Sequence, residues 1–189
     1  MIPIIVSISS LLAGIGLLLT GLGLLGTILG VRAATEGFPD GLTGLVMSAY
    51  FAGFVLGTYL CPGIVRRVGH IRAYSAFAAI ASVCAFAHAL LINPLAWGLM
   101  RFVTGVCLVG LYLVVESWLN SETPNEQRGR IFAIYMTVTL LALALGQYLL
   151  LIDPAAGFAA FGIASVLFSL GLVPVALTRH PEPRPVPVA

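Results

Sequence analysis

Charged residues are scarce in this 189-residue chain: they make up 8% of it, against about 25% in a typical soluble domain. Lysine is absent, so every basic residue other than histidine is an arginine. Without lysine the chain can have neither a Walker A phosphate-binding lysine nor a Schiff base on lysine. Hydrophobic residues make up 60% of the sequence, and its mean hydropathy is +1.08. This composition excludes a soluble enzyme, a disordered chain and a nucleic-acid-binding protein, and it predicts an integral membrane protein.

The sequence also lacks the patterns of metal, disulfide and hydrolase sites. Its three cysteines are odd in number and form no C-x-x-C pair, so we expect free, buried thiols at Cys61, Cys84 and Cys107. Neither H-E-x-x-H nor G-x-S-x-G occurs. A G-x-G-x-x-G at 21–26 has no preceding strand, so we interpret it, together with the Gly26–Gly30 pair, as a helix-packing surface. We expect no enzymatic activity, no metal and no cofactor.

Six apolar stretches are long enough to cross a bilayer as helices, which takes about 20 residues each. We predict spans at about 4–31, 42–60, 73–92, 95–119, 131–152 and 155–177. Pro62 and Pro174 are expected at helix ends, where proline costs little. Residues 1–178 are therefore predicted to form an all-α, six-helix transmembrane bundle in contact with the lipid bilayer. Residues 179–189 are rich in proline, which is typical of an extended tail or linker.

Arginines are distributed unevenly between the two sides of these spans. Two of them, Arg32 and Arg101, belong to the side that holds the first, third and fifth connections. The other side carries Arg66, Arg67, Arg72, Arg128, Arg130, Arg179 and Arg184. Because cytoplasmic loops carry the excess of basic residues, both termini are predicted to lie in the cytoplasm.

Two ionisable residues lie within the fourth span, where a charge at the helix centre costs about 2.5–3.5 kcal/mol on insertion scales. Arg101 and Glu116 are fifteen residues apart, which is roughly 22 Å along a helix. They differ by only about 60° in direction around the helix axis, and Gly105 and Tyr112 share that face. We therefore expect this face to lie against protein or water.

A structural explanation exists for each of these polar residues. Arg101 could extend to the outer interface, and Glu116 could neutralise Arg66 or Arg130. Gln147 could bond across helices or line a cavity. His88, near the outer end of the third span, is expected at the membrane interface.

The segment Gly57–Arg72 resembles motif A of the major facilitator superfamily. Gly57 and the basic pair Arg66 and Arg67 match the motif, while Cys61 stands where the motif has an acid. The fourth span begins with Arg101-Phe-Val-Thr-Gly105, which looks like motif B, whose arginine is associated with proton coupling in the family.

More specific likenesses are to the YcaD-like branch of bacterial transporters. They cover the segments 44–53, 67–72 (which includes Gly69 and Arg72), 115–120 and 128–130, together with Tyr135-Met136. Taken together, the resemblance extends from the first span to the tail.

The resemblance implies an ion- or proton-coupled secondary transporter of the major facilitator type in the inner membrane of a bacterium, of which this chain is the N-terminal six-helix half. It implies alternating access and a small-molecule substrate that the sequence does not identify, with a second six-helix half or a homodimer needed for transport. Candidates for the substrate or proton pathway are Arg101, Tyr112, Gln147 and Tyr50. Candidates for a cytoplasmic gate are Arg66, Arg67, Arg72 and Glu116. The alternative is a truncated, non-transporting membrane fragment or interaction module.

Overall fold

A computed structural model describes residues 2–177 of the chain, with side chains from residue 8 onward. This part contains six helices long and apolar enough to cross a membrane. They are α1 (Ile2–Thr35), α2 (Asp40–Val68), α3 (His70–Leu90), α4 (Pro94–Glu122), α5 (Arg128–Tyr148) and α6 (Phe158–Ala176). The short 3-10 helices η1 (Asn125–Gln127) and η2 (Leu149–Ile152) flank α5. The predicted all-α membrane fold is confirmed, whereas the tail at 179–189 lies outside the described residues.

The second helix is longer than its predicted span. It continues to Val68 with Pro62 inside it, and Pro174 likewise lies inside α6, so the expectation that both prolines mark helix ends is wrong. Membrane helices tolerate an internal proline because neighbouring groups satisfy the freed carbonyl. The chain turns instead at Gly69, whose φ of 88° is a conformation that glycine adopts readily. Arg66 and Arg67 therefore lie in the last turn of α2 and not in a loop.

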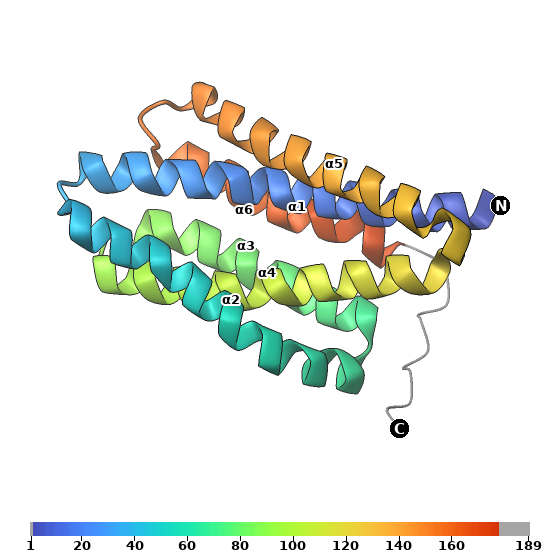
Figure 1. Cartoon of the computed structure of the whole chain (residues 1–189). Helices are drawn as coiled ribbons and strands as arrows, with labels where there is room; N and C mark the ends of the chain where they lie inside the picture. The colour runs from blue at the N-terminus through green and yellow to red at the C-terminus, as the bar shows by residue number, and fades with distance from the viewer. Residues whose placement is uncertain (1, 178–189) are drawn as a thin grey trace.

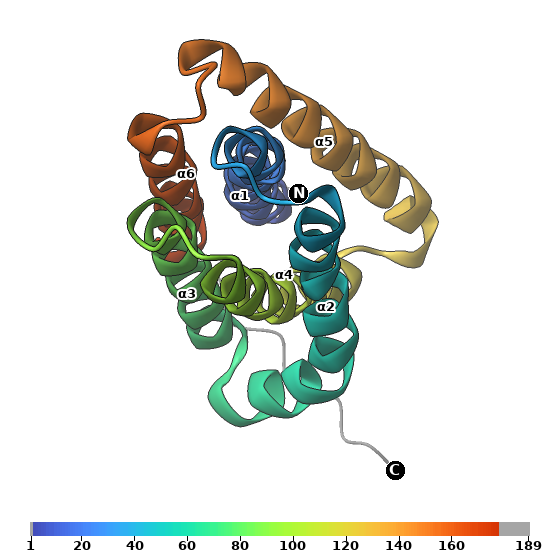
Figure 2. The same cartoon turned by 90° about the vertical axis from the view of Figure 1, so that its left-hand side faces the viewer.

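The helices run alternately up and down, so α1 begins and α6 ends at the same end of the bundle (Figure 1). The α2–α3 turn and the α4–α5 connection lie at that end too. The most extensive helix contacts form a continuous series, α2–α4–α3–α6–α1–α5. Seen along the bundle, α2 and α5 are the two ends of this series (Figure 2). These two helices are also the least covered, with 22% of the most apolar window of each buried in the bundle.

Glycines set the close crossing of α2 and α4. A Cβ atom on Gly53 would overlap the carbonyl oxygen of Phe102, and one on Gly105 would overlap that of Tyr50. The motif A glycine, Gly57, lies against side-chain and backbone atoms of α4 in the same way. Small residues let membrane helices approach closely, so these glycines have a packing role.

A second glycine crossing joins α1 to α5. A Cβ on Gly23 would overlap the backbone of Leu143, and Gly146 lies equally close to the backbone of α1. Gly21 packs against α6, so part of the G-x-G-x-x-G does serve helix packing. Gly26 has open space around its Cβ position, and Gly30 has only the end of a methionine side chain nearby. The interpretation of Gly26 and Gly30 as a packing pair is therefore wrong.

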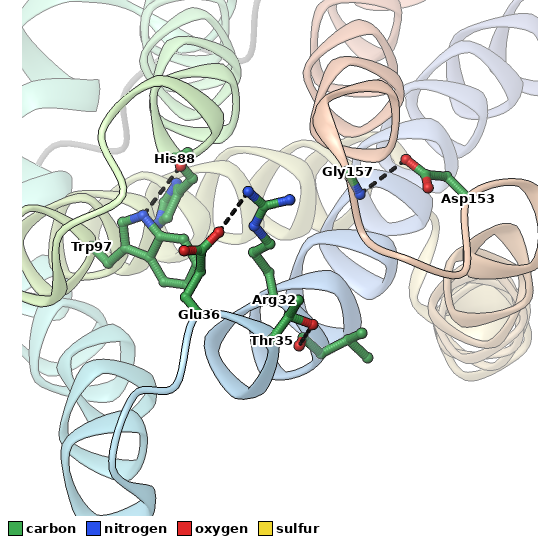
Figure 3. A network of polar contacts seen from close by, with 8 residues as sticks. Arg32, Thr35, Glu36, His88, Trp97, Asp153 and Gly157 are labelled. Atoms are coloured by element: carbon green, nitrogen blue, oxygen red, sulfur yellow. Dashed lines mark hydrogen bonds and ion pairs between the residues drawn. The ribbon is translucent and has the colours of Figure 1, made fainter.

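Polar contacts join the helix ends on the side away from the N-terminus (Figure 3). Arg32, in the last turn of α1, forms an ion pair of 2.6 Å with Glu36 in the turn that follows the helix. Asp153 accepts a hydrogen bond of 2.9 Å from the backbone N–H of Gly157 and so satisfies the start of α6. Asn93 caps α4 by accepting from the backbone of Leu95 at 2.9 Å. These contacts fix the turns that connect the helices at this end.

His88 is fully buried near the end of α3, so its side chain faces the inside of the bundle, while its place at the level of the membrane interface stays a prediction. Its Nδ1 lies 2.6 Å from the carbonyl oxygen of Cys84, and its own carbonyl accepts a hydrogen bond of 3.1 Å from the indole of Trp97. Its ring stacks on Phe161 at 6.3 Å with an angle of 4° between the planes. The aromatic surroundings and the local hydrogen bond explain why a histidine is accommodated inside the bundle.

Candidate functional site: two cavities beside α4

Three of the four predicted pathway residues come together around one open cavity of about 390 Å³, which we call the arginine cavity. Arg101 from α4, Tyr50 from α2 and Gln147 from α5 line it. The opposite wall is the middle of α1, where Gly26 leaves space and Thr27 adds a hydroxyl. A volume of this size lies within the range of about 300–1,000 Å³ that is typical of small-molecule sites.

Arg101 is buried to 7% exposure and does not extend to the interface. Its guanidinium carbon lies 4.6 Å from the centre of the Tyr50 ring. Its Nε and Nη1 atoms are buried and have no hydrogen-bond partner. No carboxylate among the described residues forms an ion pair with Arg101.

Within the described bundle, the contacts of Arg101 do not offset the cost of burying its charge. Burying an unpaired ion costs several kcal/mol even after relaxation. A cation–π contact such as that with Tyr50 returns about 0.5–2 kcal/mol. The contact with Tyr50 therefore does not by itself offset the burial of the guanidinium group, and a buried charge beside a cavity is a candidate for a functional site.

Tyr112 and Glu116 lie around a second cavity of about 450 Å³ between α2, α4 and α5, which we call the glutamate cavity. The exposed Glu116 carboxylate accepts a hydrogen bond of 3.2 Å from the buried Tyr135 hydroxyl. The other residues that line the glutamate cavity are Phe54, Gly57, Thr58, Cys61, Pro62, Val109, Leu113, Met136 and Thr139. The shared face predicted for Arg101 and Tyr112 is thus divided along the helix between two cavities.

Aromatic rings connect the two cavities. The Phe54 ring lies 6.1 Å from that of Tyr50, which lines the arginine cavity. On its other side it lies 6.3 Å from the ring of Tyr112, which lines the glutamate cavity. These spacings fall in the range of packed aromatic pairs, about 4.5–7 Å between centroids. A continuous row of three aromatic side chains, Tyr50, Phe54 and Tyr112, therefore runs from the arginine cavity to the glutamate cavity.

The predicted ion pair of Glu116 with Arg66 or Arg130 is not present, since Tyr135 is its hydrogen-bond partner. Arg66, Arg67 and Arg72 are exposed, and none of them makes an ion pair with a described residue. They lie where α2 ends and α3 begins, at the same end of the bundle as the glutamate cavity. Their role in a gate stays a prediction.

The sequence interpretation missed the inner face of α5. Tyr135, Thr139, Ala142 and Gly146 are the buried residues of this helix, and the first two line the glutamate cavity. Their spacing of three or four residues is that of one helix face, which could have been recognised from the sequence. Cys61, in the acid position of motif A, donates its thiol to the carbonyl oxygen of Val106 at 3.4 Å.

The Tyr135–Glu116 hydrogen bond predicts a modest effect on stability. We expect Tyr135→Phe to lower the free energy of unfolding by about 0.5–1.5 kcal/mol, the usual net value of one hydrogen bond. Glu116→Gln keeps an acceptor oxygen and should cost less. Thermal unfolding in detergent measures both changes. Strictly additive effects in the double variant would contradict a direct interaction between the two side chains.

The Major Facilitator Superfamily family model matches residues 5–189, which is nearly the whole chain. The chain belongs to this superfamily. The six helices are consistent with half of a major facilitator bundle, as the motif resemblances predict. No solved structure gives a significant match.

Curated relatives carry the name that the resemblance predicts. An uncharacterized MFS-type transporter of Enterobacter sp. strain 638 is 33% identical over 117 residues, covering 62% of this chain and 31% of the relative. The uncharacterized MFS-type transporter YcaD of Escherichia fergusonii is 30% identical over 146 residues, covering 77% of this chain and 38% of the relative. YcaD of Escherichia coli O139:H28 is 36% identical over 106 residues, covering 56% of this chain and 28% of the relative. The matched part of the chain thus covers about a third of the length of these relatives.

Proposed function

We propose that this chain is the N-terminal six-helix half of a secondary transporter that moves a small solute across the bacterial inner membrane by alternating access. The arginine cavity is the half-site for the solute, and a second six-helix half or a second copy completes it. The observation that carries the proposal is the buried, uncompensated Arg101 at an open cavity formed by four helices. Transporters of this superfamily bind their substrates between two six-helix halves near the membrane midplane.

The distribution of covered and uncovered helices supports a second half. α2 and α5, which are the least buried helices, stand on either side of both cavities. A surface for another bundle would lie along these two helices and over the cavity openings. Lipid would cover the remaining outer faces.

The glutamate cavity supports a route toward the cytoplasm and a site for proton coupling. Glu116 is the titratable acid that lines this cavity, and Arg101 lies further along the same helix. Arg66, Arg67 and Arg72 would form the gate at the cytoplasmic end, with both termini on that side. This orientation rests on the excess of arginine at that end.

Cysteine labelling from both sides of the membrane tests alternating access. We expect Gln147→Cys to react with a membrane-impermeant maleimide in right-side-out and in inverted vesicles, because its cavity opens to each side in turn. The three native cysteines are buried, so the unsubstituted protein provides the background.

Leu145→Cys is the matched control on the same helix. Leu145 is 56% exposed but lies on the opposite flank of α5 from Gln147, about 200° away around the axis. It should remain unlabelled in both vesicle preparations because lipid covers it. Labelling of Gln147→Cys from one side only, or at the level of Leu145→Cys, would contradict alternating access at this cavity.

A further inference from the structure

The arginine cavity presents hydrogen-bond donors and a positive charge. Two guanidinium nitrogens of Arg101 are without partners. The Tyr50 hydroxyl and the Gln147 amide also make no hydrogen bond with a described residue, so both can donate to a ligand. The Thr27 hydroxyl already donates to the carbonyl oxygen of Gly23 at 2.9 Å.

None of the acidic residues in the described part of the chain forms an ion pair with Arg101. Glu36 is paired with Arg32, Glu116 belongs to the glutamate cavity, and Asp153 caps α6. The three other described acids lie at helix ends or in a connection: Asp40, Glu122 and Glu126. None of the six compensates Arg101, so its charge acts on whatever enters the cavity.

We propose that the arginine cavity binds a small organic anion, a carboxylate with an apolar body, through Arg101, Tyr50 and Gln147. A carboxylate supplies the two acceptor oxygens that a guanidinium fork fits. Leu22 and Phe51 provide apolar contacts for the remainder of the solute. This inference rests on the proposed transport function and adds the charge class of the substrate. A neutral solute would leave the guanidinium uncompensated, and a cation would be repelled.

Three probes of nearly the same shape separate charge from size: benzoate is an anion, benzamide is neutral and benzamidinium is a cation. Binding of each to the purified full chain is measured by isothermal titration calorimetry in nanodiscs. We expect benzoate to bind at least about tenfold more tightly than benzamide, since charge-assisted hydrogen bonds are roughly twice as strong as neutral ones. Benzamidinium should show no binding.

Arg101→Gln tests whether the preference comes from this residue. The variant should bind benzoate and benzamide equally, and its unfolding temperature shows whether it remains folded. Arg130→Gln, an exposed arginine that lines neither cavity, should keep the benzoate preference.

The outcomes distinguish this inference from the transport function. Equal or tighter binding of benzamide or benzamidinium would overturn the anion assignment and leave the solute site intact. Absence of binding by all three probes would also overturn it, because the arginine cavity of this chain would then not hold a carboxylate. The labelling of Gln147→Cys does not depend on the charge of a ligand, so it tests the transport proposal separately.

Discussion

Arg101→Met is expected to raise the thermal stability of the bundle. Methionine keeps most of the apolar stem and removes a cation that no described carboxylate neutralises. Replacing even a paired set of buried charges by apolar side chains of similar volume is often neutral or stabilising, by about 1–4 kcal/mol, and an unpaired cation has no partner to offset its desolvation. The contact with Tyr50 that is lost contributes less, about 0.5–2 kcal/mol. Thermal unfolding in detergent measures the difference.

Two further variants test whether the gain in stability comes from removing the buried charge of Arg101. Arg101→Lys keeps the charge and should show no gain in stability. Arg32→Met removes the partly exposed ion pair with Glu36 and should destabilise the protein slightly, by about 0.3–0.5 kcal/mol. A clear loss of stability in Arg101→Met would show that the arginine has a structural role.

The same position should have a large effect on transport. We expect solute uptake by vesicles containing Arg101→Ala to fall to background, while the amount of protein inserted in the membrane stays normal. The physical reason is the loss of the cation that fills one wall of the arginine cavity. Retained uptake would remove Arg101 from the pathway.

Gly105→Ala is expected to weaken the crossing of α2 and α4. The added methyl group meets the backbone carbonyl of Tyr50, which cannot move aside as a flexible side chain would. Overpacking of this kind costs about 1–3 kcal/mol. The displaced backbone also carries the Tyr50 ring that lies over Arg101, so solute binding should weaken as well.

Gly98→Ala is the matched control on the same helix. Nothing lies within 4 Å of the Cβ position at Gly98, and alanine is about 1 kcal/mol better than glycine inside a helix. This variant should therefore be as stable as the parent or more stable. If the two alanine variants unfolded at the same temperature, the close crossing at Gly105 would be contradicted.

Hydropathy was sufficient to predict the six helices, because a span needs only length and apolar composition. It could not locate the end of α2, since Pro62 is tolerated inside this helix and the turn depends on the backbone conformation of Gly69. Hydropathy also could not predict that His88 is buried inside the bundle. A lone histidine in an apolar stretch gives no sign of the stacked ring and indole that surround it.

The candidate site was predicted in part because helix geometry places residues by direction. Arg101 is buried in the fold as its position on α4 suggested, and Tyr50 and Gln147 line the same cavity. Direction alone did not reveal that Tyr112 belongs to another cavity, because that division depends on how α2 and α5 pack along α4. Tyr135 was missed as the partner of Glu116 for the same reason.

We propose that these six helices are one half of a two-half transporter. The most direct test of this claim is the protein mass of the particle extracted gently from native membranes, measured by light scattering with the detergent contribution subtracted. We expect a particle of about twice 19.8 kDa or more, because the proposal requires a second half over the arginine cavity. A particle containing one 19.8 kDa chain and no other protein would contradict the claim.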